Sequence, residues 1–279
     1  MKILANKTAL ITGSSRGIGL GVGRKFVDNG AQVVLTSEQS LEQALAEISG
    51  TQTDKQYNAE VLILRQLLES GNAHYVQADM GNDEEIERLV EEAWKLLGTI
   101  EILVNNVGIY KEPAFLEITR EDFDRVFGIN VWSHIKTTQE FVRRRMAENS
   151  GGRILHTTSV NDERSEPGHT LYDPTKAAVS AIVRQLAIEL APNKFTTMGI
   201  AAGLHETRIT DFGLRSEPRN RELIEGQIPL GIGSVEDVAY WYPFAASDAA
   251  RYATGTILRV DGGITPMQIP VRPIAENEG

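Results

Sequence analysis

The sequence of 279 residues predicts an α/β protein with a doubly wound, mostly parallel sheet of seven strands and helices on both of its faces. Three observations lead to this class. Short apolar runs alternate along the chain with segments in which apolar residues recur every three or four positions. Hydrophobic residues make up 41% and charged residues 24%, which is typical of soluble globular proteins. A glycine-rich turn joins the first apolar run to the first helical segment, which is typical of the βα units of such sheets.

Strands and helices are predicted in alternation along most of the chain. The helix after Asn82 is the clearest, because Asn82 or Asp83 can cap its start and its pattern ends near Gly98. The helical patterns begin after Gly17, Leu41, Asn82, Thr119, Thr170 and Ser234. The strand-like runs lie at Thr8–Ile11, Gln32–Leu35, Ala73–Gln77, Ile100–Asn105, Arg153–Thr157, Phe195–Ala201 and Thr256–Val260.

Two segments interrupt the alternation. Residues 49–60 are polar and turn-rich and residues 61–68 resume a helical pattern, which predicts an inserted segment over 49–70. Residues 204–228 carry many charged and few large apolar side chains, which predicts a mobile lid over a site. The tail 266–279 holds three prolines and is expected to pack on a surface or fray. Nothing marks a linker, so residues 1–265 are predicted to form one domain.

Charge and composition argue against several classes of function. The net charge of −10 and the pI of about 5.1 disfavour nucleic acid as a partner, since the only dense basic run is Arg143 to Arg145. The chain has no cysteine, so it has neither disulfides nor thiolate metal ligands, and no other spacing suggests a metal site. No secretory signal is visible, and no apolar run approaches the roughly 18–20 residues of a membrane span. We therefore expect a soluble cytoplasmic protein with no membrane partner.

The glycine-rich turn runs from Thr12 to Gly19, with glycines at positions 13, 17 and 19. Glycines there allow a tight turn and let a pyrophosphate approach the N-terminus of the following helix, where free N–H groups favour negative charge. The turn alone is equally consistent with a purely structural role. Its position after the first strand favours dinucleotide binding.

A second pattern pairs Tyr172 with Lys176, four residues apart and so on one face of a helix. A phenol with a pKa near 10 is a poor base at neutral pH, and a neighbouring ammonium lowers that pKa. Tyr172 is thus a candidate proton donor and acceptor. One such pair also arises readily by chance, so the pair by itself does not decide the function.

The order of these motifs resembles the short-chain dehydrogenase/reductase family from about Lys7 to Gly263, including its FabG-like and its sugar or alcohol dehydrogenase members. The resemblance implies a Rossmann fold. The matching positions are Thr12-Gly13-x-x-x-Gly17-x-Gly19, Asp79 after the third strand, Asn105-Asn106-Val107-Gly108, Asn130, Ser159, Tyr172, Lys176 and Val260-Asp261-Gly262-Gly263.

By this resemblance Ser159 would hydrogen-bond the substrate oxygen, Tyr172 would transfer the proton and Lys176 would bind the nicotinamide ribose and depress the pKa of Tyr172. Asn130 would support a water that links Lys176 to solvent. The cofactor-binding residues would be Gly13, Ser15, Arg16, Gly17, Ile18, Gly19, Ser37, Glu38, Asp79, Met80, Asn106, Val107, Gly108, Tyr172, Lys176, Gly203 and Thr207.

Two departures from the family pattern concern the cofactor side. Val107 replaces the usual Ala, which would narrow the pocket or shift the ring, and Ala202-Gly203 replaces Pro-Gly. The choice of cofactor is expected at the end of the second strand, where an acidic group reads ribose hydroxyls and a basic group reads a 2′-phosphate. Glu38 there favours NAD. Arg16, which could reach a 2′-phosphate or pair with Glu38, keeps NADP as the alternative.

The predicted function is an NAD(P)-dependent oxidoreductase acting on a small secondary alcohol or carbonyl, such as a sugar, polyol or cyclic ketone. Asn161, His169 and His205 are the substrate candidates, although polar side chains near Ser159 could equally face solvent. The alternatives are a dinucleotide-binding sensor or scaffold without turnover, and an enzyme in which redox is one step of an epimerisation or dehydration. The resemblance also implies a homotetramer or homodimer, formed through the helices that hold Phe123–Met146 and Thr170–Ala191.

Overall fold

Seven parallel strands form one sheet in the order β3-β2-β1-β4-β5-β6-β7 in this computed structural model, which describes residues 2–46, 52–111, 113–207, 210 and 218–267. Every predicted strand is confirmed, and no boundary moves by more than two residues. The strands are β1 Thr8–Ile11, β2 Gln32–Ser37, β3 Ala73–Gln77, β4 Ile102–Asn105, β5 Gly152–Ser159, β6 Phe195–Ala202 and β7 Ile257–Val260.

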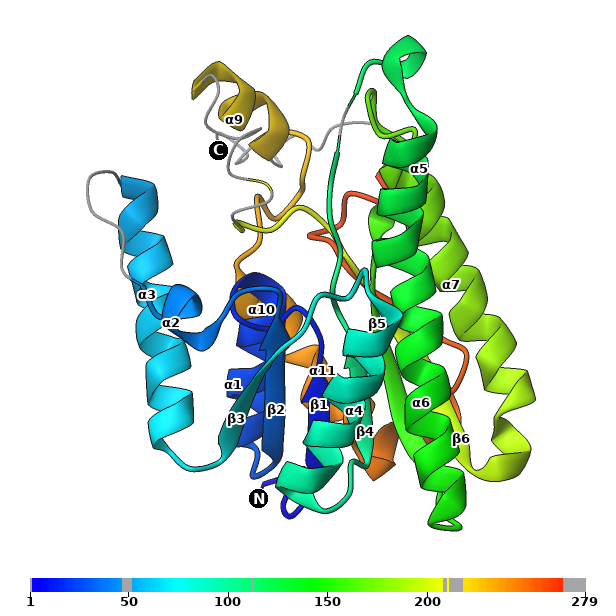
Figure 1. Cartoon of the computed structure of the whole chain (residues 1–279). Helices are drawn as coiled ribbons and strands as arrows, with labels where there is room; N and C mark the ends of the chain where they lie inside the picture. The colour runs from blue at the N-terminus through cyan, green and yellow to red at the C-terminus, as the bar shows by residue number, and fades with distance from the viewer. Residues whose placement is uncertain (1, 47–51, 112, 208–209, 211–217, 268–279) are drawn as a thin grey trace, which may run out of the picture.

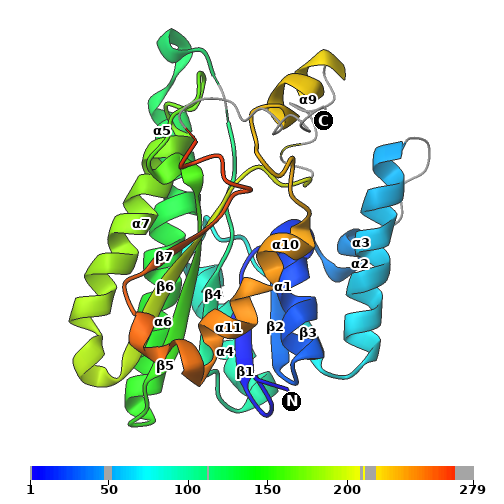
Figure 2. The same ribbon diagram turned by 180° about the vertical axis from the view of Figure 1, so that it is seen from behind.

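Helices cover both faces of this sheet. Helices α4, α6 and α7 lie on one face, and α1, α10 and α11 lie on the other (Figures 1 and 2). None of the helices within the described ranges is both long and apolar enough to cross a lipid bilayer. The helices are α1 Gly17–Asp28, α2 Leu41–Ala44, α3 Gln52–Glu69, α4 Asp83–Leu97, α5 Arg120–Phe127, α6 Ser133–Ala147, α7 Tyr172–Glu189, α9 Pro218–Glu225, α10 Val235–Ala239 and α11 Trp241–Ala246.

Short turns of other helical types complete the chain between these elements. Most of them lie in connections after strands or at the ends of helices. They are the 3₁₀ turns η1 Phe115–Glu117, η3 Val160–Asp162, η4 Ala191–Asn193 and η5 Asp248–Ala253, and the π-helical turn η2 Gly128–Trp132.

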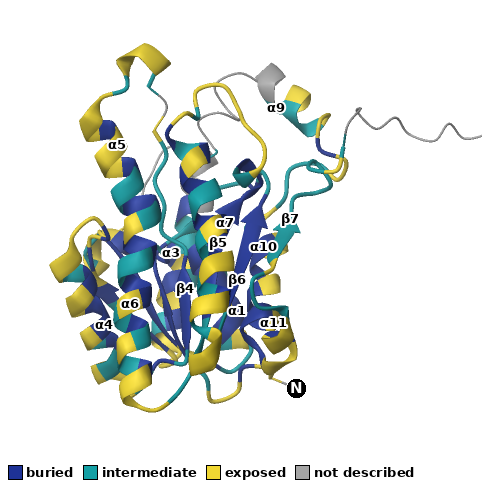
Figure 3. Ribbon diagram, turned by 90° about the vertical axis from the view of Figure 1, so that its right-hand side faces the viewer, coloured by how far each residue is buried: buried dark blue, intermediate teal, exposed yellow. Residues whose placement is uncertain are grey.

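The core consists of two apolar layers separated by the sheet. Successive residues of a strand point to opposite faces, so Ile11 packs in the layer under α1 while Leu10 packs in the layer under α4. Because both faces are covered, the central strands are buried along their whole length, and Figure 3 shows them in dark blue between half-exposed helices. This explains why their sequences are continuous apolar runs rather than alternating ones.

The topology creates a crevice at the carboxyl ends of the strands. From β1 the chain moves outward to β2 and β3, then returns so that β4 pairs with the other side of β1. In open parallel sheets, ligands bind at the carboxyl ends of the strands at this reversal. The crevice therefore lies between the loops that follow β1 and β4.

The ends of α4 confirm the predicted capping. Asn82 is the N-cap, and its Oδ1 accepts hydrogen bonds from the N–H groups of Glu84 at 2.9 Å and Glu85 at 3.3 Å. Gly98 ends the helix with a φ of 78°, a conformation that favours glycine. Asn82 and Gly98 in the sequence were thus sufficient to predict both ends of this helix.

The segment between β2 and β3 differs from its prediction. Residues 52–60, expected to be turn-rich, belong to α3, which runs without interruption to Glu69. The stretch contains neither Gly nor Pro, and its Gln, Lys and Glu residues have good helix propensity. The N-terminal half of α3 rises past the carboxyl ends of β2 and β3 (Figure 1).

The predicted lid and tail are described only in part. Helix α9 lies above the carboxyl edge of the sheet (Figure 1), and residues 208–209 and 211–217 fall outside the described residues. Residues 268–279 of the predicted tail and residues 49–51 of the predicted insertion also lie outside them.

Candidate active site

A cavity of about 550 Å³ lies at the carboxyl edge of the sheet, in the crevice between the β1 and β4 loops. It brings together most of the residues that the sequence singled out. Gly19, Asn130, Asn161 and His169 do not line it. The predicted residues that do line it are Gly13, Ser15, Arg16, Gly17, Ile18, Ser37, Glu38, Asp79, Met80, Asn106, Val107, Gly108, Ser159, Tyr172, Lys176, Gly203, His205 and Thr207.

The glycine-rich turn is shaped by close backbone approach. Gly13 has a φ of 60°, and a Cβ on it would lie 2.8 Å from the Cα of Val107. A Cβ on Gly19 would lie 2.3 Å from the carbonyl oxygen of Gly13. Gly17 differs, because among the described residues a Cβ there would meet only the Thr207 Cγ2, at 4.0 Å. The turn is tight where it packs and open where α1 begins, which fits a pyrophosphate at the helix N-terminus.

Thr12 and Asn106 clamp the β1 loop to the β4 loop. The Thr12 hydroxyl accepts from the N–H groups of Asn106 at 3.0 Å and Val107 at 3.1 Å. The Asn106 side-chain amide donates to the carbonyl oxygens of Thr12 at 3.0 Å and Gly13 at 2.8 Å, and its Oδ1 accepts from Thr157 at 3.0 Å. The floor of the cavity is thus preorganised by side chains of three neighbouring strands.

The end of the cavity beside β2 carries one ion pair. Arg16 Nη2 lies 3.2 Å from Glu38 Oε1, and both side chains are substantially exposed. The Ser37 hydroxyl is hydrogen-bonded to the Tyr75 hydroxyl at 2.7 Å. Asp79 Oδ1 accepts from the N–H of Gly81 at 2.8 Å, which shapes the turn after β3. Of the two possibilities for Arg16, the structure shows its pairing with Glu38.

Ser159, Tyr172 and Lys176 meet at the opposite end of the cavity. Ser159 ends β5, Tyr172 begins α7, and the Ser159 hydroxyl lies near enough to Tyr172 to affect the pKa of its phenol. Lys176 lies one turn along α7, with its Nζ 5.4 Å from the centre of the Tyr172 ring and 3.2 Å from the Thr157 carbonyl oxygen to which it donates. The strand and the helix together place two hydroxyls and one ammonium around a single point.

Burial controls the titration of this group. It raises the pKa of Tyr172, Asp173 raises it further, and the hydrogen bond from Ser159 acts in the opposite direction. Burial also lowers the pKa of Lys176 to about 8. Burial thus sets the direction of the Tyr172 pKa, and the expectation that Lys176 depresses this pKa stays a prediction.

Asn130 lies in the π-helical turn η2 and is fully buried. Its Oδ1 accepts from the N–H of Ile109 at 2.8 Å, while its amide donates to the Ile109 carbonyl at 2.9 Å and to the Thr175 hydroxyl at 3.1 Å. Such turns interrupt α-helices frequently at functional sites. Here Asn130 ties the loop after β4 to the first turn of α7.

Asn161 and His169 act behind the wall of the cavity. Asp173 Oδ1 lies 2.8 Å from the Asn161 side-chain amide and 2.9 Å from His169 Nδ1, and His169 Nε2 lies 2.6 Å from the hydroxyl of Tyr110. Of these four residues, Tyr110 lines the cavity, and its ring packs edge-on against the ring of Tyr172. Sequence reasoning missed Tyr110 and Asp173, although their signals were a Tyr two residues after Gly108 and an Asp beside Tyr172.

His205 lines the cavity near the described part of the lid. It is 4% exposed, its Nδ1 lies 2.9 Å from the carbonyl oxygen of Gly203, and burial lowers its pKa. A backbone bridge to Gly233 fixes its position. His205 is thus held by backbone groups with one edge toward the cavity.

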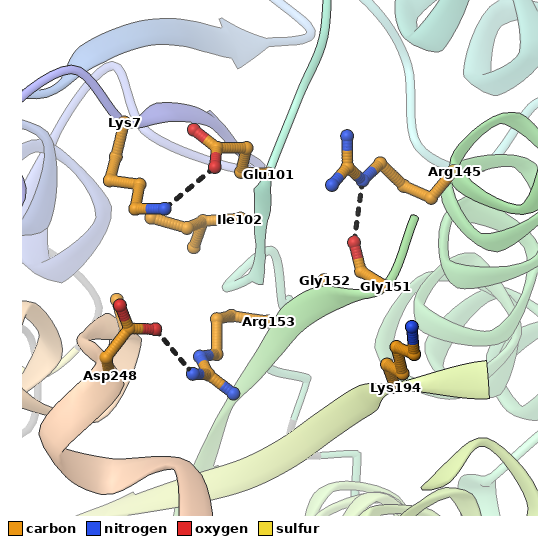
Figure 4. Close-up of a pocket in the computed structure, with 10 residues that line it drawn as sticks. Lys7, Glu101, Ile102, Arg145, Gly151, Gly152, Arg153, Lys194 and Asp248 are labelled. Atoms are coloured by element: carbon orange, nitrogen blue, oxygen red, sulfur yellow. Dashed lines mark hydrogen bonds and ion pairs between the residues drawn. The ribbon is translucent and has the colours of Figure 1, made fainter. Parts of the chain in front are cut away.

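A second, smaller hollow of about 200 Å³ lies at the opposite edge of the sheet (Figure 4). Two ion pairs lie beside it: Lys7 pairs with Glu101 at 2.8 Å, and Arg153 pairs with Asp248 at 2.8 Å. Arg145 donates from Nε to the Gly151 carbonyl at 2.8 Å. These contacts tie the amino ends of the strands together, and the hollow lies far along the strands from Tyr172.

Replacing Lys176 by Met is expected to raise the free energy of unfolding by about 2 kcal/mol at pH 7. The lowering of the Lys176 pKa from 10.5 to about 8 means that the folded state holds this proton less tightly, a cost of about 3 kcal/mol. Loss of the hydrogen bond to Thr157 reduces the gain in stability by about 1 kcal/mol. The cost is fully present below pH 8 and vanishes as the pH rises toward 10.5, so urea unfolding should show the two proteins converging at pH 10. A variant less stable than the wild type at pH 7 would contradict this account.

Comparison with known proteins agrees with this geometry. A family model described as Enoyl-(Acyl carrier protein) reductase matches residues 13–265. The 3-oxoacyl-[acyl-carrier-protein] reductase FabG of Aquifex aeolicus is 33% identical over 94% of this chain and 98% of its own. The L-rhamnose 1-dehydrogenase (NAD(P)(+)) of Azotobacter vinelandii is 32% identical over 94% and 98%.

Solved structures agree as well. A short-chain type dehydrogenase/reductase from Mycobacterium marinum superimposes with a TM-score of 0.82 at 29% identity, covering 95% of this chain and 97% of its own. A structure from Agrobacterium tumefaciens, assigned as a 2-deoxy-D-gluconate 3-dehydrogenase with bound NADP, gives 0.80 at 26% identity over 95% and 99%. The chain is therefore a member of the short-chain dehydrogenase/reductase family of NAD(P)-dependent oxidoreductases.

Proposed function

We propose that the protein interconverts a secondary alcohol and its carbonyl compound, with Tyr172 as the general acid and base. The observation that carries this proposal is that Ser159, Tyr172 and Lys176 line the same cavity as the glycine-rich turn. A bound nicotinamide supplies or accepts the hydride. The glycine turn, Asn106 and the open face of Gly17 would hold the dinucleotide.

Each residue has a distinct task in this proposal. Ser159 donates a hydrogen bond to the substrate oxygen and so orients its carbon toward the cofactor. Tyr172 gives its hydroxyl proton to that oxygen in reduction and takes the proton back in oxidation. Lys176, protonated for the most part at pH 7, binds the ribose and offsets the charge that develops on Tyr172. Asn130 positions Ile109 and α7 and would support the water through which the proton is replaced.

We infer that NAD is preferred over NADP. Support comes from Glu38, whose carboxylate lines the cavity at the end of β2 and pairs with Arg16, the cation nearest to a 2′-phosphate. Relatives vary in this respect, since the rhamnose dehydrogenase is named with either cofactor. The preference therefore depends on this chain's own residues.

Replacing Glu38 by Arg is expected to move the preference toward NADP by at least about tenfold. The change removes a carboxylate that repels a 2′-phosphate and adds a guanidinium that binds it, and it also releases Arg16. The ratio of NADH and NADPH dissociation constants, from fluorescence titration, measures the effect. Asp28→Asn is a suitable control of charge outside the cavity. An unchanged ratio would mean that the ribose is read elsewhere.

The substrate class is proposed to be polar, such as a sugar, polyol or cyclic ketone. Tyr110 presents a hydroxyl beside Tyr172, and His169 and Asp173 fix its direction. His205 lies on the other wall. Support comes also from the names of two relatives, an L-rhamnose 1-dehydrogenase and a 3alpha-hydroxysteroid dehydrogenase.

The test of the function is dinucleotide binding followed by turnover. NADH and NADPH are titrated by fluorescence or calorimetry, and the same protein is then assayed by reduced-nicotinamide absorbance against alcohols, sugars and ketones. Binding with turnover is the expected result. Binding without turnover across the panel would instead favour a dinucleotide-binding sensor, and absence of binding would overturn the assignment of the glycine turn.

Three broader features remain part of the proposal. Residues 1–265 would form one domain, with 266–279 as its tail and 204–228 as its lid. The face formed by α5, η2, α6 and α7, which exposes Phe123, Trp132 and Ile188, would associate with further copies in a homodimer or homotetramer. The protein would act in the cytoplasm.

A further inference from the structure

Helix α3 brings a carboxylate to the glycine-rich turn. Glu60, in the third turn of α3, accepts a hydrogen bond from the backbone N–H of Gly17 at 2.9 Å. Gly17 is the first residue of α1, and its N–H is one of the donors that an α-helix leaves free at its start. The first turn of α1 contains no acidic residue of its own. The carboxylate at this helix start is therefore supplied from 43 residues further along the chain.

This contact places a second acidic group beside the cofactor turn. Arg16 pairs with Glu38, and the next residue, Gly17, bonds Glu60. Two successive residues of the turn thus each contact a carboxylate, one from the end of β2 and one from α3. Arg16 is the only basic residue from Thr12 to Gly19.

We propose that Glu60 is a cofactor-specificity residue, which disfavours a 2′-phosphate and so strengthens the preference for NAD. The inference deepens the proposed function and rests on it. A 2′-phosphate adds about two negative charges next to Arg16, whereas a ribose hydroxyl adds none. A carboxylate bonded to the Gly17 N–H, next to Arg16, repels the phosphate and has little effect on the ribose hydroxyl.

The same geometry explains why α3 is long. Its C-terminal half packs on the sheet layer through Leu64 and Leu67, while its N-terminal half extends beyond the carboxyl ends of β2 and β3 (Figure 1). A helix that ended at the edge of the sheet would not carry Glu60 to Gly17. The residues that the sequence marked as an interruption thus bring a carboxylate to Gly17, a residue that lines the cavity.

The decisive variant is Glu60→Gln, which keeps an oxygen that can accept from Gly17 but removes the charge. Fluorescence titration of the full chain with NADPH is expected to show a dissociation constant about tenfold lower than that of the wild type. The dissociation constant for NADH should stay within about twofold. Calorimetry with adenosine 2′,5′-bisphosphate and with AMP should give the same contrast without a nicotinamide. Glu69→Gln, an exposed acid at the end of the same helix, is the matched control and should change neither constant.

The outcomes separate this inference from the function on which it rests. If the wild type binds neither dinucleotide, the proposed function fails. If NADH binds but Glu60→Gln leaves the NADH to NADPH ratio unchanged, only the role of Glu60 is overturned. Equal tightening of both dinucleotides would also overturn it, because the charge would then act on the shared pyrophosphate.

Discussion

Replacing Tyr172 by Phe is expected to lower kcat by about a thousandfold while dinucleotide affinity stays within about threefold. The substitution removes only the hydroxyl that carries the proton. The ring should keep its place, because it packs edge-on against Tyr110 at 5.3 Å and His169 at 5.9 Å between centroids. Steady-state kinetics with the best substrate of the panel and fluorescence titration with NADH measure the two quantities.

The control for this variant is Tyr252→Phe, since Tyr252 is 94% exposed and lies on η5, away from the cavity. It should change neither quantity. Turnover of Tyr172→Phe near that of the wild type would refute the role of Tyr172. A parallel loss of cofactor affinity would show that the hydroxyl maintains the structure of the site rather than transferring a proton.

Replacing Gly19 by Ala is expected to lower the free energy of unfolding by about 3 kcal/mol, which corresponds to a fall in Tm of roughly 6–12 °C. The new Cβ would lie 2.3 Å from the Gly13 carbonyl oxygen and 2.9 Å from the Cα of Ser14. Both are backbone atoms of the turn, so the turn itself must move. The new Cβ would also lie 2.5 Å from the Asn106 amide nitrogen. Displacement of this amide should weaken NADH binding by more than tenfold.

Gly128→Ala is the matched control for this prediction. A Cβ on Gly128 meets no described residue within 4 Å, and its φ of −56° suits any residue. The Tm of Gly128→Ala should equal that of the wild type or be slightly higher, because Ala has a better helix propensity than Gly. Equal transitions for the two variants would mean that the turn can widen without cost.

Local patterns were sufficient for most of the fold. The boundaries of β1 and β3 agree with the prediction to the residue, because an apolar run between turn residues leaves little choice of ends. The start of α3 was missed, since residues 52–60 carry no apolar face and their helix is selected by context rather than periodicity. Order and spacing of motifs also placed Ser159, Tyr172 and Lys176 at one cavity.

Contacts across the fold could not be read in the same way. Asn161 and His169 stand near Ser159 and Tyr172 in sequence, yet their side chains turn to Asp173 behind the cavity wall. The direction of the Tyr172 pKa depends on desolvation, which no spacing reveals. The bond from Glu60 to Gly17 depends on how far α3 extends and how it rotates, and both follow from packing.

The clamp between Thr12 and Asn106 has a consequence for how the protein acquires its activity. The two residues are 94 positions apart in the chain. Their pairing requires β4 to dock beside β1. This can happen only after β2, β3 and the helices between them have been synthesised. Contacts between distant segments of a parallel sheet form slowly. A nascent chain that ends before β4 therefore carries the whole glycine turn without the support that shapes it, and competence to bind a dinucleotide should arise only late in folding.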